Sequence, residues 1–183
     1  MRITGGILAG RLVAVPPGEI RPSMDRMRES VFASLGDLSG ISFLDIFTGS
    51  GIIAIEAASR GALSITAVEQ DKLKRKILLE NVSISPVRIN CCFMPAELYV
   101  KRAVHGKSKI KPFNIIFLDP PFRYQFKWEL VANIASSGLV TDGTKILIHR
   151  PRSDFLNADI PNLEKTDSRE YGRSIVDFFN FNN

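Results

Sequence analysis

The most informative stretch of this sequence is Asp119-Pro120-Pro121-Phe122, which combines a carboxylate with a rigid turn. It directly follows apolar residues 115–118, a run that is typical of a buried strand. The two prolines fix their φ angles, donate no N–H and end the strand, so the turn presents carbonyl oxygens and one carboxylate. A site of hydrogen-bond acceptors suits a planar exocyclic amine, because Asp119 and the Pro120 carbonyl could accept its N–H bonds.

Such a turn would favour methylation of the amine. Accepting both N–H bonds draws the nitrogen lone pair out of conjugation and aims it at an incoming methyl group, so catalysis rests on positioning and electrostatics. Phe122 could stack on the base that carries the amine, a contact worth about 1–3 kcal/mol. The alternative interpretation is that Asp119-Pro120-Pro121 is only a turn, since Asp and Pro are common in turns.

A second stretch, containing Asp45, Phe47, Gly49 and Gly51, leads from an apolar run through a glycine turn into an expected helix. Glycines at such a turn allow positive φ angles and a close approach of a ligand to the backbone. Together with Ala54 they also fit the loose dinucleotide pattern G-x-G-x-x-A, which is a weak signal when it stands alone.

The acidic residues near this turn indicate which ligand it binds. Glu69 ends the next apolar run, where a carboxylate can accept hydrogen bonds from both ribose hydroxyls of an adenosine. Asp45 would repel a pyrophosphate and attract ammonium and sulfonium groups, so S-adenosylmethionine is the expected cofactor. The alternative is that Asp45 caps the glycine loop and Glu69 caps the following helix.

The elements that must position these residues alternate regularly from residue 41 onward. Apolar runs predict strands over 41–47, 64–69, 87–93, 113–119 and 145–149, with a further run over 174–181. Helical patterns lie between them over 51–60, 71–83, 96–104 and 126–137. This alternation predicts an α/β fold with a mostly parallel sheet and helices on both faces. Ligands of such sheets bind at the carboxyl ends of the strands, which is where Asp45, Glu69 and Asp119 fall.

Residues 1–40 differ from the rest of the chain. Glycines and prolines divide the first part into turns or a hairpin, and a helix is expected from about Asp25 to Leu35. Residues 1–28 carry two acidic residues and five arginines, namely Arg2, Arg11, Arg21, Arg26 and Arg28. Because arginine binds phosphate bidentately, we interpret 1–40 as a basic extension that docks on RNA and 41–183 as the catalytic domain. The alternative is an ordinary solvated face.

Composition excludes several other classes of protein. The chain has 183 residues, of which 45% are hydrophobic and 23% charged, so it can bury a core and is not disordered throughout. No apolar run approaches the length of a membrane helix, and that of residues 1–11 is too short for a signal peptide. The two cysteines are adjacent, which indicates reduced thiols in a cytosolic protein and no zinc site. The net charge of +5 suits a polyanionic partner without proving one.

Two motifs together resemble a known class of enzyme. Asp-x-Phe-x-Gly-x-Gly at 45–51 and Asp-Pro-Pro-Phe at 119–122 are similar to those of the amino-directed S-adenosylmethionine-dependent methyltransferases. Within that class, five further segments of the chain resemble the bacterial 16S ribosomal RNA (guanine(966)-N(2))-methyltransferases. They are residues 2–6, 10–11, 21–23, 25–32 and 171–173. The resemblance covers nearly the whole chain. It implies a Rossmann-like methyltransferase fold with a seven-stranded sheet and a cytoplasmic location.

The resemblance also implies roles for individual residues. Residues 119–122 would form the catalytic turn, Glu69 would bind the ribose, and the methionine part of the cofactor would lie against Asp45, Phe47, Gly49 and Gly51. The chain departs from the family at two places. The first is Pro95, which stands before the helix that follows the third strand, where the family usually has an acidic or amide residue; a backbone contact from Ala96 to adenine is therefore expected. The second is His149, which ends the fifth strand where the family commonly has a glutamate.

We therefore predict a monomeric enzyme, without metal or membrane contact, that uses S-adenosylmethionine. Its substrate would be the N2 amine of a guanine in 16S ribosomal RNA, within an assembling small subunit. An adenine N6 methyltransferase acting on DNA or RNA could have the same turn, and a non-catalytic RNA-binding or assembly factor could keep the fold. A nicotinamide-dependent oxidoreductase is disfavoured by Asp45 and by the acceptor turn. A glutamine-directed protein methyltransferase would resemble Asn-Pro-Pro-Tyr there.

Overall fold

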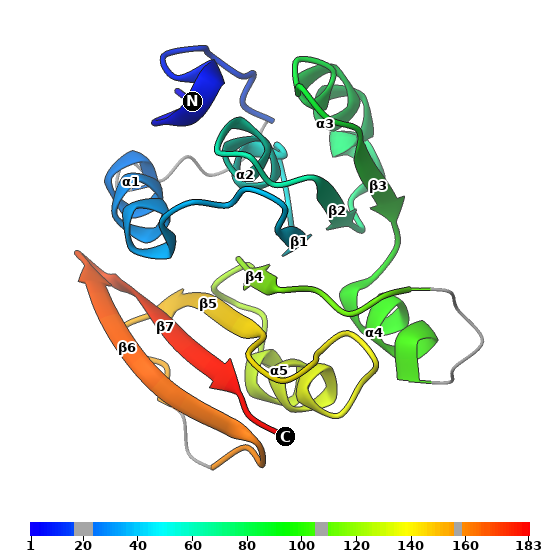
Figure 1. Ribbon diagram of the computed structural model, residues 1–183, viewed down its shortest axis with the longest axis vertical. Helices are drawn as coiled ribbons and strands as arrows, with labels where there is room; N and C mark the ends of the chain where they lie inside the picture. Colours follow the sequence, from blue (N-terminus) through cyan, green and yellow to red (C-terminus); the bar gives the residue numbers. More distant parts are fainter. Residues whose placement is uncertain (17–23, 105–109, 156–158) are drawn as a thin grey trace.

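The computed structural model describes residues 1–16, 24–104, 110–155 and 159–183, and its centre is one seven-stranded sheet (Figure 1). The strands are β1 (Ser42–Ile46), β2 (Ser64–Glu69), β3 (Ile89–Phe93), β4 (Ile115–Leu118), β5 (Lys145–Pro151), β6 (Leu163–Tyr171) and β7 (Ser174–Phe181). Their spatial order is β3-β2-β1-β4-β5-β7-β6. β1 to β5 run parallel, whereas β7 is antiparallel to both of its neighbours. The predicted mostly parallel α/β sheet is therefore confirmed.

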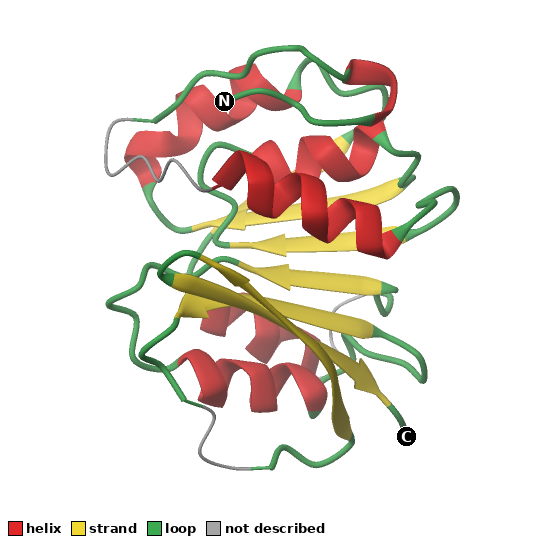
Figure 2. Ribbon diagram, turned by 90° about the vertical axis from the view of Figure 1, so that its left-hand side faces the viewer, coloured by secondary structure: helices red, strands yellow, loops and turns green. Residues whose placement is uncertain are grey.

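Helices cover both faces of this sheet (Figure 2). They are α1 (Met24–Leu35), α2 (Ile52–Ser59), α3 (Arg75–Val82), α4 (Ala96–Val104) and α5 (Lys127–Ala135). The first three lie on one face and the last two on the other. Successive residues of a strand point to opposite faces, so Phe43 packs in the core on the α2 side and Leu44 in the core beneath α4 and α5. Burial on both faces explains why these strands read as continuous apolar runs.

Two elements differ from the sequence prediction by more than a shift of their ends. Residues 71–83 were expected to form one helix, and the structure divides them into a short 3₁₀ helix, η2 (Lys72–Lys74), and α3. Strand β6 was not predicted at all. It is an edge strand whose side chains are mostly exposed, with an irregularity between Lys165 and Asp167, so its sequence lacks the apolar face that marks a strand.

Residues 1–16 form a small hairpin that packs on α2. Arg2 and Leu12 make an antiparallel bridge, and a 3₁₀ helix, η1 (Gly6–Leu8), lies between them. The backbone N–H of Leu8 donates to Ser59 Oγ over 2.9 Å. The hairpin contributes three buried side chains to the core on the α2 side: Ile3, Leu8 and Val13. The N-terminal segment and the sheet therefore share one hydrophobic core.

The described residues include no helix with the length and apolar character of a membrane span.

Candidate active site

Three carboxylates gather at the carboxyl edge of the parallel strands. Asp45 lies near the end of β1, Glu69 is the last residue of β2, and Asp119 directly follows β4. The backbone N–H of Asp119 donates to Ile46 O over 3.1 Å, which ties the turn to the end of β1. The negative charges of Asp119 and Glu69 both act on Asp45. The predicted convergence of these residues is confirmed, because parallel strands in register end at one edge.

The glycine loop between β1 and α2 has an unusual backbone. Phe47, Gly49 and Gly51 all have positive φ angles, of 65°, 57° and 83°. A side chain on Gly51 would come within 2.7 Å of Leu78 in α3, so the packing of that helix also requires glycine there. A Cβ atom placed on Gly49 would have its nearest neighbour, the backbone oxygen of Phe47, 4.0 Å away, so the side of Gly49 where a side chain would stand has room for a ligand. The left-handed conformation of Phe47 is costly for a non-glycine residue, and such strain is concentrated at binding sites.

Asp45 is completely buried at the base of this loop. Its Oδ2 accepts hydrogen bonds from Thr48 Oγ1 and from the backbone N–H of Ala54. Its Oδ1 has no partner among the described residues, and the atom is buried. Burial raises the pKa of Asp45 from 3.8 to about 7, and the neighbouring negative charges add to this effect. Asp45 therefore caps the loop, and it also keeps one oxygen that a cationic group could satisfy.

The raised pKa of Asp45 predicts how the stability of the ligand-free protein depends on pH. The folded state holds the proton up to about pH 7 and the unfolded state only to about pH 4, so this group makes folding less favourable as pH rises between them. We expect Asp45→Asn to remove this contribution, which amounts to a few kcal/mol at about 1.4 kcal/mol per pKa unit. Urea unfolding at pH 5 and pH 8 would measure it. Equal pH dependence of the two proteins would contradict the prediction.

Glu69 is only 5% exposed and holds the loop from the side of β2. Its two oxygens accept hydrogen bonds from the backbone N–H groups of Gly49 and Asp71, each over 2.8 Å. The Nζ of Lys74 lies 3.8 Å away. Glu69 does not cap the following helix, because the N-cap of η2 is Asp71, whose side chain accepts from the backbone N–H of Leu73. A carboxylate oxygen accepts more than one hydrogen bond, so this arrangement leaves the predicted ribose contact possible in chemical terms.

The turn after β4 carries the predicted acceptor groups. Pro120 is buried, Pro121 is exposed, and Phe122 is half-buried. The backbone N–H of Tyr124 donates to Pro121 O over 2.8 Å and closes the turn. The side chain of Asp119 is 16% exposed, and its Oδ1 lies 2.8 Å from Nδ1 of His149 at the end of β5. One carboxylate oxygen of Asp119 is thus engaged by the protein.

Tyr124 connects this turn to the other parts of the site. Its ring lies 5.2 Å from that of Phe47 in the glycine loop. Its hydroxyl donates to Glu97 Oε1 over 2.5 Å, at the start of α4 next to the buried Ala96. Burial and the Glu97 carboxylate raise the pKa of Tyr124 above its usual range. The side chain therefore braces the turn against the loop and against α4.

Lys127 is a second support of the turn, and the sequence did not indicate it. It is 4% exposed, and its Nζ donates to the backbone oxygens of Phe122 and Tyr124. It also forms an ion pair with Asp154, over 2.9 Å, in the segment after β5. A lysine at the start of a helix is usually solvated, so nothing in the local pattern marks this one as buried.

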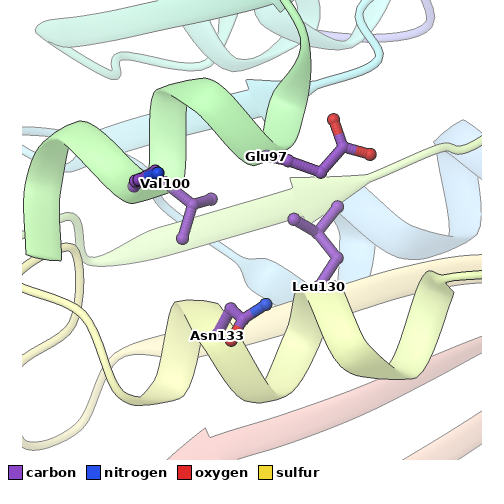
Figure 3. A pocket seen from close by; sticks show the side chains of 5 residues that line it. Glu97, Val100, Leu130 and Asn133 are labelled. Carbon is purple, nitrogen blue, oxygen red and sulfur yellow. The ribbon is translucent and has the colours of Figure 1, made fainter.

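Two hollows adjoin these residues. One, of about 440 Å³, lies beside the turn and is lined partly by Arg123, Trp128 and Phe155. Phe155 is 73% exposed. The other, of about 330 Å³, lies between α4 and α5, where Val100 and Leu130 point toward one another (Figure 3). Among the described residues that line this second hollow, Glu97 is the one that contacts the site, through Tyr124. The candidate site therefore lies at the edge of the sheet and not in the helix layer.

The predicted RNA-binding arginines do not share one environment. Arg2, Arg11 and Arg26 are exposed. Arg21 lies outside the described residues. Arg28 has no exposed surface and pairs with Asp25 at 2.6 Å and with Glu56 at 3.6 Å. The prediction that Arg28 contacts RNA is therefore wrong, because a fully buried guanidinium cannot reach a phosphate.

The known proteins that resemble this chain agree with one another in sequence family and in fold. Residues 1–180 match a family model described as conserved hypothetical protein 95. Ribosomal RNA small subunit methyltransferase D of Escherichia coli K12 is 33% identical over 151 residues, which cover 81% of this chain and 73% of that protein. Putative rRNA methyltransferase YlbH of Bacillus subtilis is 30% identical over 94% of both chains. The solved structure of the putative methyltransferase yhhF from Escherichia coli is 27% identical with a TM-score of 0.84, over 100% of this chain and 98% of that one.

Proposed function

The chain belongs to the conserved hypothetical protein 95 family, and we propose that it transfers a methyl group from S-adenosylmethionine to the N2 amine of a guanine in 16S ribosomal RNA. The observation that carries this proposal is the acceptor turn, in which Asp119 stands before two prolines at the edge of the sheet that also holds the glycine loop. The names of the Escherichia coli and Bacillus subtilis relatives support ribosomal RNA as the substrate class.

The residues of the glycine loop fit the cofactor. The unpaired Oδ1 of Asp45 suits its ammonium group, and the open space beside Gly49 suits its methionine part. Glu69 would accept the ribose hydroxyls, and the backbone of Ala96, at the start of α4, would contact the adenine. S-adenosylmethionine supplies an electrophilic methyl group when it is bound. The remaining contributions to the reaction come from the side chains and backbone of the chain itself.

In the proposed reaction the turn acts by accepting hydrogen bonds. Asp119 and the carbonyl of Pro120 accept the two N–H bonds of the guanine amine, which frees the nitrogen lone pair for attack. Phe122 stacks on the base and holds it in position. Transfer would break the bond between the methyl group and the cofactor sulfur, and the methylated nitrogen, which is strongly acidic, would then lose its proton to water. Exposed Arg2, Arg11 and Arg26 would bind phosphates of the surrounding RNA.

The proposal can be tested by transfer of a tritiated methyl group followed by nucleoside analysis. Small ribosomal subunits from a strain lacking this modification serve as substrate, with naked ribosomal RNA and DNA in parallel. We expect N2-methylguanosine on the subunits. N6-methyladenine would preserve the mechanism and overturn the choice of base. Measurable cofactor binding without any transfer would contradict the proposed activity.

Glu69→Ala should weaken S-adenosylmethionine binding by about 10–100-fold, the effect expected for hydrogen bonds to a charged group. Isothermal titration calorimetry measures this directly, with Glu80→Ala as a control because Glu80 is an exposed carboxylate on α3. Since Glu69 also holds the backbone of Gly49, a 2′-deoxy cofactor analogue separates the two roles. The substitution should cost less affinity for the analogue than for the cofactor. Unchanged cofactor affinity would refute the ribose contact.

A further inference from the structure

His149 of β5 touches the carboxylate that is proposed to bind the amine. Its Nδ1 lies 2.8 Å from Asp119 Oδ1, and its side chain is 2% exposed. We propose that His149 is a positioning residue, which holds one oxygen of Asp119 so that the other stays directed at the target amine. This inference rests on the proposed function, because it assumes that Asp119 accepts the N–H bonds of the amine.

The sheet fixes the relative position of these two residues. β4 and β5 are parallel neighbours in which Leu118 is the partner of Ile148, so Asp119 and His149 come next on adjacent strands. On its other side, Asp119 is bound to β1 through the hydrogen bond from its backbone N–H to Ile46 O. Backbone pairing with β1 and a side-chain contact with β5 together leave this carboxylate little freedom to rotate. Preorganisation of this kind keeps the acceptor aligned before the amine arrives.

The hydrogen-bonding capacity of the two groups specifies the histidine tautomer. An ionised carboxylate only accepts hydrogen bonds, so Nδ1 of His149 must carry the proton that it shares with Asp119. In a neutral imidazole the other nitrogen, Nε2, is then an acceptor. Among the described residues, Nε2 has no partner, and the atom is buried. A buried nitrogen without a protein partner calls for an explanation, and a place beside the binding position of the target amine supplies one.

His149 also contacts the residue that is proposed to stack on the base. The Phe122 ring meets the imidazole edge-on, with 5.7 Å between the ring centroids and an interplanar angle of 67°. The His149 side chain thus contacts both the acceptor carboxylate of Asp119 and the ring of Phe122. Loss of the N–H group at Nδ1 should therefore disturb the alignment of the amine more than it disturbs cofactor binding.

Three substitutions separate this role from simple packing. His149→Asn keeps an N–H donor near the position of Nδ1, His149→Gln moves the amide one bond further out, and His149→Leu removes the donor. We expect His149→Leu and His149→Gln to lower kcat on the order of 100-fold, as a small misplacement of a reacting group does. His149→Asn should recover most of that loss. KM for the subunits and the affinity for S-adenosylmethionine should stay within about twofold in all three variants. Equal kcat in the Asn and Leu variants, or no loss in any of them, would overturn the proposal.

A spectroscopic measurement tests the contact without relying on turnover. Nitrogen-15 NMR of the imidazole reports which ring nitrogen carries the proton, and the signals of His149 are assigned from their absence in His149→Leu. We expect a proton on Nδ1 in the unchanged protein and its loss from that nitrogen in Asp119→Ala, which removes the acceptor. A proton on Nε2 would overturn the proposal. If no RNA is methylated while Nδ1 carries the proton, the proposed substrate fails and the positioning contact stands.

Discussion

Replacing Asp119 with Ala should lower kcat for methyl transfer by about 100–1,000-fold, the range found when one preorganised hydrogen-bonding group is removed from a catalytic site. The affinity for S-adenosylmethionine should remain close to that of the unchanged protein. The reason is that Asp119 touches the turn, β1 and His149, whereas the glycine loop is held by Asp45 and Glu69. Single-turnover kinetics together with calorimetric cofactor binding would measure both quantities.

The Asp119→Asn variant sharpens this test because it preserves the shape of the side chain. Asn offers one acceptor oxygen and one NH₂ group, so that either His149 or the target amine would meet a donor. Its activity should therefore also fall steeply. Asp142→Asn is the matched control, since Asp142 is exposed and precedes β5, at the opposite edge of the sheet. Full activity of Asp119→Asn would contradict the acceptor mechanism and would leave the turn with a structural role only.

The convergence of Asp45, Glu69 and Asp119 could be predicted because it depends on topology alone. Apolar runs that alternate with helical patterns imply parallel strands, and the carboxyl ends of such strands share one edge. The same reasoning could not find β6, whose exposed side chains carry no apolar period. Neither could it find the buried contacts of Lys127, since those depend on where the segment after β5 crosses the turn.

The burial of Arg28 could be predicted from the periodicity of the sequence around it. Buried residues of α1 fall at Met27, Val31 and Phe32, which is the spacing of one helix face, and Arg28 lies within that face. A count of arginines ignores this periodicity, whereas the helical pattern would have placed the side chain against the core. His149 differs, because its departure from the family's glutamate could be read from the sequence but its contact with Asp119 required the structure.

The buried position of Arg28 leads to a large expected effect on stability. Glu56 of α2 is completely buried, accepts the backbone N–H of Thr4 over 2.5 Å, and pairs with Arg28 and with Arg60 at 3.6 Å and 3.3 Å. Glu56→Ala removes one of the two carboxylates that pair with the buried Arg28, which keeps its contact with Asp25, and leaves the N–H of Thr4 without its acceptor. We expect a cost of about 3 kcal/mol. In a chain of this size, that corresponds to a fall in Tm of roughly 10 °C. Calorimetry or urea unfolding would measure it.

Two further variants identify the source of this effect. Glu56→Gln keeps an acceptor for Thr4 and removes only the charge, so its loss should be intermediate. Replacing Arg28 with Met and Glu56 with Leu together should recover much of the stability, because apolar side chains of similar size often replace a buried ion pair without loss. If Glu56→Ala cost less than about 1 kcal/mol, the network would contribute little to holding α1 and the N-terminal hairpin on α2. A large loss that the paired variant recovers would instead assign Arg28 to the fold, and would leave RNA contact to the exposed arginines.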